Sequence, residues 1–166
     1  FMPYEYSRLG ASSSEFGLWF SLTSVGYIFG NLLNSKLTMK HGLEKMCLYG
    51  SILNFIFILK LIVINQTGIN SIFFLTLTCS LIGFAHGFVV ANAMIGAINS
   101  VKNNQGAASG LMGALQVGFG GLAGFLIIYF GGANVFIISL LGILIMSIIS
   151  LLASVMINRK IMILPK

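Results

Sequence analysis

The sequence predicts an all-α membrane protein with five transmembrane helices. Hydrophobic residues make up 57% of the 166 residues and charged residues only 7%, a composition too apolar to cover the surface of a soluble protein. Five apolar segments reach the roughly 20 residues that a helix needs to cross the hydrocarbon core of a bilayer. Short polar connections join these segments. None of the segments shows the period-2 alternation of a β-strand, so each is expected to form a helix, in which the backbone N–H and C=O groups are hydrogen-bonded within the segment.

The five segments differ in composition. In chain order they are residues 16–36, the most polar; 46–64, nearly all large aliphatic residues and Phe; 71–98, the longest; 106–131, rich in Gly; and 134–157, almost entirely Ile, Leu and Ser. Together they predict a five-helix bundle over residues 16–157, with the lipid bilayer as its surroundings.

Basic residues are distributed unequally between the two sides of this bundle. The side holding the first and third connections and the C-terminus carries Lys36, Lys40, Lys45, Lys102, Arg159, Lys160 and Lys166. The opposite side carries Arg8, and its two connections hold no cation. Lys60 lies one turn inside that side and can extend its side chain outward. Because cytoplasmic loops collect Lys and Arg, we expect the Lys- and Arg-rich side of the membrane protein, including a tail over residues 158–166, to lie in the cytoplasm.

An odd number of helices then places residues 1–15 outside the cell. This segment has no basic region, apolar stretch or cleavage site that would export it, and the chain opens on Phe. A further helix upstream, ending near Met2 or Pro3, would provide the export. We therefore expect a truncated six-helix unit, with residues 1–15 as the outer segment after the missing helix.

Small and polar residues form a stripe along the first segment. Gly17, Ser21, Ser24, Asn31 and Ser35 recur at helical spacing. Such a stripe either packs against another helix, since small and hydroxyl residues permit close approach, or forms one wall of a polar cavity. Both interpretations are open, and Asn31 is a candidate for a substrate pathway.

The fourth segment carries more small residues than any other. The residues expected to pack against neighbouring helices are Gly106, Gly110, Ala114, Gly118, Gly120 and Gly124. Gln116 lies on a neighbouring face of the same segment and is a second pathway candidate.

The third segment contains His86, the only side chain within the apolar segments that titrates near neutral pH. An ionisable residue at this depth marks a substrate or proton path, or else is a neutral His bonded to a backbone carbonyl. Asn92 lies nine residues beyond Gly83, which is about 180° around an unbroken helix. His86 and Asn92 complete the set of four pathway candidates.

The sequence argues against several classes of chemistry. It contains no Asp, and Glu5, Glu15 and Glu44 lie in loops or at helix ends, so no carboxylate is expected at membrane depth for ion coupling. It has no zinc-protease, nucleophile-elbow or phosphate-binding motif and no Cys/His cluster. We expect no catalytic residues, metal site or cofactor, no nucleic-acid partner, and therefore no enzyme.

Three blocks of sequence resemble the major facilitator superfamily, in the form of its Bcr/CflA-type (bicyclomycin resistance-like) multidrug transporters. LNSKLTMKHGLEKM, residues 33–46, is similar to their connection between helices eight and nine, with Lys40 and Gly42 at the positions of the cytoplasmic loop motif. GFVVANAMIGAI, residues 87–98, and QGAASGLMGALQ, residues 105–116, are similar to their tenth and eleventh helices. Met39, Leu43 and Glu44 depart from the loop motif, and Ala91 stands where the family commonly has Pro.

The resemblance implies that the five segments correspond to helices eight to twelve. It further implies the C-terminal half of a drug:proton antiporter, inactive alone, whose partners are a missing N-terminal half and a small hydrophobic or cationic drug-like substrate. The alternative, from a different class, is an autonomous small membrane protein that acts through helix–helix contacts.

Overall fold

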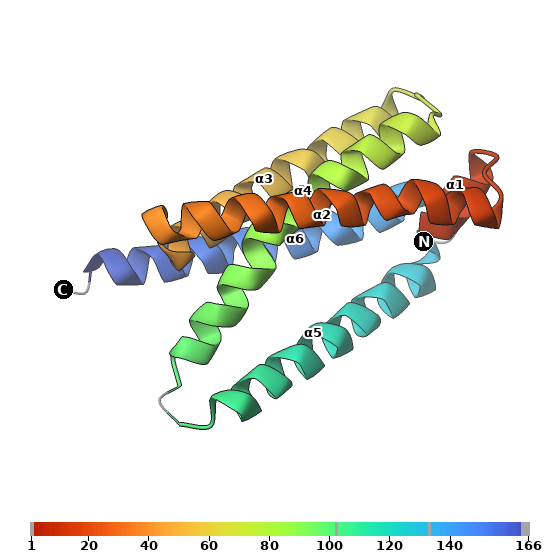
Figure 1. The fold of residues 1–166 in the computed structure, drawn as a ribbon. Helices are drawn as coiled ribbons and strands as arrows, with labels where there is room; N and C mark the ends of the chain where they lie inside the picture. The colour runs from red at the N-terminus through yellow and green to blue at the C-terminus, as the bar shows by residue number, and fades with distance from the viewer. Residues whose placement is uncertain (1, 102, 133, 164–166) are drawn as a thin grey trace.

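The computed structural model describes residues 2–101, 103–132 and 134–163, and over these residues the chain is helical (Figure 1). The elements are α1 (Met2–Arg8), α2 (Ser13–His41), α3 (Leu43–Gln66), α4 (Ile72–Asn99), α5 (Gln105–Ile127), the π-helical turn η1 (Ile128–Gly132) and α6 (Phe136–Ile163). Five of the helices are long and apolar enough to cross a membrane. The predicted fold class is therefore confirmed.

The ends of α2 show why the helices run beyond the apolar segments. The Ser12 backbone N–H donates to Glu15 Oε2 at 2.8 Å, and the Glu15 backbone N–H donates to Ser12 Oγ at 3.4 Å, so a capping box starts the helix at Ser13. At the other end, a connection was expected over residues 37–45, but α2 continues to His41 and α3 begins at Leu43, so Gly42 alone joins them. The φ of Gly42 is 86°, a conformation that favours glycine. Likewise, α6 continues to Ile163, where a tail was expected from residue 158.

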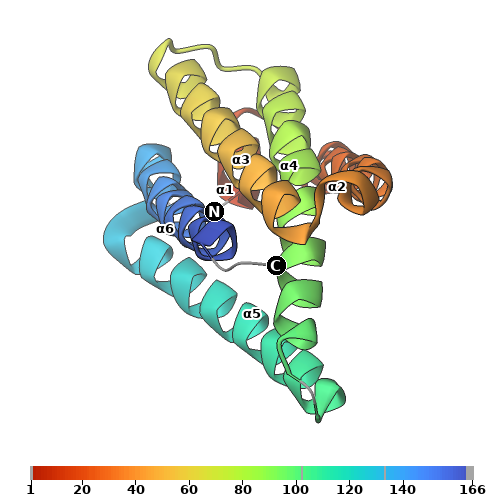
Figure 2. The ribbon, with the colours of Figure 1, turned by 90° about the vertical axis from the view of Figure 1, so that its left-hand side faces the viewer.

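Helix α4 lies at the centre of the bundle. It packs against α2 on one side and α3 on another, and α3 packs in turn against α6 (Figures 1 and 2). We call the end with Lys40, Lys45 and Arg159 the basic end, and the opposite end, with α1 and η1, the α1 end. A buried hydrophobic cluster lies at the α1 end and consists of Tyr6, Leu61, Leu75, Cys79 and Leu140.

The α2–α4 contact depends on a Gly-x-x-x-Gly pair in each helix. A methyl group on Gly26 or Gly30 would overlap the backbone carbonyl of Ser80 or Phe84 in α4. Reciprocally, Gly83 and Gly87 face the backbone of α2. Two helices of large residues could not approach this closely, so these glycines set the separation of the pair.

Helix α5 departs from the bundle, as Figures 1 and 2 show. None of its residues is buried. No atom of the described chain outside the helix lies within 4 Å of a Cβ built on Gly106, Gly110, Gly118, Gly120 or Gly124, and Ala114 is exposed. The expected packing of these residues is therefore not made among the described residues, because the divergence of α5 leaves their faces open.

Candidate substrate-pathway surface

The polar stripe of α2 faces away from its neighbours within the described chain. Ser21, Ser24 and Ser35 are exposed, and Asn31 is half-buried. The hydroxyls of Ser21 and Ser35 donate to carbonyls three residues earlier in the same helix, at 2.6 and 2.8 Å, and Asn31 Nδ2 donates to Tyr27 O at 3.0 Å. Among the described residues the stripe is not used for helix packing, because the contact with α4 uses the face of α2 that carries Gly26 and Gly30.

Asn92 lies in a buried polar network between α2 and α4. Its Nδ2 donates to Asn34 Oδ1 at 2.7 Å and to Phe88 O at 2.6 Å. Thr38 Oγ1 is 2.9 Å from Asn34 Oδ1 and 3.0 Å from Asn92 Oδ1, and its one proton can be donated to either. Asn92 is only 2% exposed. Because its amide donates to Asn34, it joins α4 to α2, as polar side chains commonly do between membrane helices.

His86 and Gln116 lie apart from this network. Both are exposed, on α4 and α5 respectively, and neither has a hydrogen-bond partner among the described residues. The interpretation of His86 as a histidine bonded to a backbone carbonyl is therefore not borne out in this part of the chain. The structure thus places Asn31, His86 and Asn92 on the α2–α4 pair and Gln116 on α5, and no hydrogen bond joins any two of these four described residues.

A hydroxyl-rich contact between α3 and α6 was missed by sequence reasoning. Ser51 Oγ lies 2.8 Å from Ser154 Oγ and 3.4 Å from Ser150 Oγ, and Cys47 Sγ lies 3.6 Å from Ser154 Oγ. The sequence does contain a pattern that indicates this contact, because the serines at positions 147, 150 and 154 recur at helical spacing along one face of the last segment.

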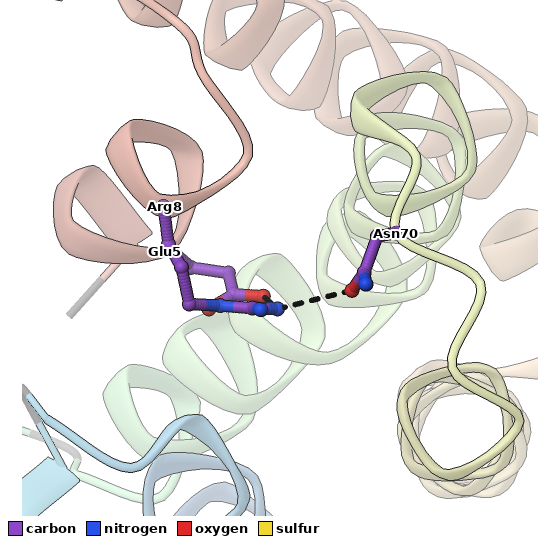
Figure 3. A network of polar contacts seen from close by, with 3 residues as sticks. All are labelled: Glu5, Arg8 and Asn70. Carbon is purple, nitrogen blue, oxygen red and sulfur yellow. Dashed lines mark hydrogen bonds and ion pairs between the residues drawn. The ribbon is translucent and has the colours of Figure 1, made fainter.

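A buried carboxylate at the α1 end was also missed, because residues 1–15 contain no long apolar segment. Glu5 is 5% exposed and accepts two hydrogen bonds from Arg8, Nε to Oε2 at 2.8 Å and Nη2 to Oε1 at 2.6 Å. Hydrogen bonding to this carboxylate raises the pKa of Arg8 above its ordinary value. The guanidinium also donates to Asn70 Oδ1 at 3.3 Å, which links α1 to the α3–α4 connection (Figure 3).

The described residues hold no group of three or more His, Cys, Asp or Glu side chains that could bind a metal ion. Five helices that are long and apolar enough to cross a membrane define a multi-pass membrane protein. A family model described as Major Facilitator Superfamily matches residues 1–160, and the chain belongs to this family. Its members are transporters, which confirms that the chain is not an enzyme. No curated protein and no solved structure matches the chain.

Proposed function

We propose that this chain forms the C-terminal half of a drug:proton antiporter of the Bcr/CflA type in the bacterial inner membrane. Its five spans correspond to helices eight to twelve, and a complementary first half provides the opposite wall of the substrate pathway. The substrate is a small hydrophobic or cationic drug-like molecule. The coupling carboxylates also belong to the first half, so this chain alone is inactive.

The observation that carries the proposal is the unpartnered polar stripe of α2. Helices α2 and α4 run in the same direction, and a helix turns by about 100° per residue. Gly26 and Gly30 mark the face of α2 that contacts α4, and Gly83 and Gly87 mark the facing side of α4. Counted from these faces, the rotation of each helix places Asn31 and His86 on the same side of the α2–α4 pair. Polar side chains left on one open side of two transmembrane helices are expected to line a water-filled cavity or a protein interface.

The open surface of α5 supports the same proposal. Its glycines offer a face on which another helix can pack at short distance. Beside it, an apolar groove of about 290 Å³ separates α5 from α6 and is lined by Ala123, Phe130, Gly142 and other apolar residues. Both features suit a helix of the same transporter that this chain does not supply, with Gln116 on the exposed α5 surface.

The test is drug accumulation in cells that carry this chain, a complementary first half with the seventh helix, or both. We expect efflux only from the two pieces together, with expression of each verified. In that pair, replacing Asn31, His86 or Gln116 by Leu should reduce efflux, and Leu152→Ala on the exposed face of α6 should not.

Energy-dependent efflux from the isolated chain would contradict the proposal. It would make His86 the leading proton carrier, because the other histidine, His41, is the last residue of α2 and lies at the basic end. A stable homo-oligomer without transport, in cells where no first half restores efflux, would favour the autonomous membrane protein.

A further inference from the structure

A cavity of about 350 Å³ lies between α3, α4 and α6 at the basic end. Leu43, Ala93, Ala97 and Ile157 give it apolar walls. This volume is within the range of sites that hold small organic molecules, which are typically apolar with a few polar groups. The cavity is separate from the polar stripe, because α2 contributes none of its walls.

Glu44 is the only charged side chain among the described residues that line this cavity. It has no hydrogen-bond or ion-pair partner in the described part of the chain. Lys40, Lys45 and Arg159 are exposed at the same end, but none of them lines the cavity. The cavity therefore combines apolar walls with one unpaired carboxylate.

The amide of Asn92, which also lines the cavity, is already engaged by Asn34, Phe88 and Thr38. It therefore offers little hydrogen bonding to a ligand, and Glu44 remains the principal polar determinant. An unpaired carboxylate beside apolar surface at the edge of a membrane favours a ligand with a positive charge and an apolar body.

We propose that this cavity binds an amphipathic organic cation, such as an alkyl or aryl ammonium ion, whose charge lies at Glu44 and whose apolar part contacts Leu43, Ala97 and Ile157. Binding here requires only α3, α4 and α6. The proposal therefore does not depend on the chain being half of a drug antiporter, and its test is independent of any transport assay.

Cys47 provides a reporter, because its half-buried thiol lines the cavity, whereas Cys79 is only 3% exposed. In the purified chain, N-ethylmaleimide adds to the Cys47 thiol at a rate that an occupant should lower. Benzyltrimethylammonium is the probe, and neopentylbenzene is its neutral isostere. We expect the cation to slow alkylation of Cys47 at concentrations where the isostere does not, with Cys79 unreacted in both cases.

Two variants test the cavity itself, with equilibrium dialysis of labelled benzyltrimethylammonium as a readout that does not require Cys47. Glu44→Gln should weaken binding by about fivefold or more, because it removes a charge a few ångströms from the ligand. Gly96→Leu should abolish binding, since Gly96 lines the cavity and its Cβ position is open. Gly121→Leu, whose Cβ position is equally open but which does not line the cavity, is the matched control.

Equal protection of Cys47 by the cation and its neutral isostere would overturn the assignment to cations. Absence of saturable binding, or binding unchanged by both Glu44→Gln and Gly96→Leu, would overturn the site. Circular dichroism of each variant establishes that the helices are retained.

Discussion

Replacing Gly30 by Ala tests the α2–α4 contact most directly. The added methyl group would overlap the Phe84 carbonyl of α4, which is backbone and cannot move aside as a flexible side chain can. The helices must therefore separate, or the backbone must shift. Overpacking of this kind costs about 1–3 kcal/mol.

Separation of the two helices would also stretch the network around Asn92. Its hydrogen bond to Asn34 is 2.7 Å long, and interhelical hydrogen bonds in membranes contribute about 0.6 kcal/mol each. The higher intrinsic helix propensity of Ala opposes these losses by up to about 1 kcal/mol. We therefore expect Gly30→Ala to lower the free energy of unfolding by about 1–3 kcal/mol.

Gly110→Ala is the matched control, because it makes the same chemical change at a position where nothing lies within 4 Å of the new Cβ. Its free energy of unfolding should equal or slightly exceed that of the parent chain. The assay is unfolding in mixed micelles by added dodecyl sulfate, followed by helical circular dichroism and by fluorescence of Trp19, which packs against the buried cluster at the α1 end.

Equal stability of the Gly30→Ala and Gly110→Ala chains would refute the reasoning, because it would mean that the Gly-x-x-x-Gly pairs do not set the helix separation. Destabilisation by Gly110→Ala alone would show that α5 packs within the isolated chain.

Three further predictions follow from the remaining contacts and charges. Asn92→Leu should lower the free energy of unfolding by about 1 kcal/mol in the same assay, since it removes the two hydrogen bonds that Asn92 makes across to Asn34 and Thr38 of α2; an unchanged value would show that the network contributes nothing. Reporter fusions after residue 166 or within residues 40–45 should indicate the cytoplasm, and one within residues 65–70 the exterior, because the cations gather at the basic end; reversed signals would contradict the orientation. Arg8→Gln should speed amide hydrogen exchange in α1, because it breaks the ion pair with the buried carboxylate of Glu5. Arg8→Lys, which keeps the charge, should speed exchange less, and unchanged exchange in Arg8→Gln would show that the ion pair does not order α1.

The five transmembrane helices could be predicted from the sequence because lipid requires every segment that crosses it to satisfy its own backbone hydrogen bonds. Apolar length and the absence of internal charge predict a membrane helix without reference to any partner, since all backbone hydrogen bonds close within the segment. The same information misjudged the helix ends. There, local chemistry at Ser12 and the positive φ of Gly42 extended α2 through residues that had been assigned to connections.

Composition and periodicity are properties of single segments, so they were enough to establish the class of protein, the number of spans and the end at which the cations gather. Which glycines are in contact became evident only from the placement of the helices against one another. Small residues permit two helices to pack closely, but they do not specify which helix is the partner. In this structure Gly26 and Gly30 lie against the helix that carries Gly83 and Gly87, whereas the more numerous glycines of α5 have no helix packed on them among the described residues. The same holds for polar side chains on α4. Asn92 is buried and bonded to Asn34 of α2, whereas His86 is exposed, because burial depends on how the helices are placed and not on the segment that carries the residue.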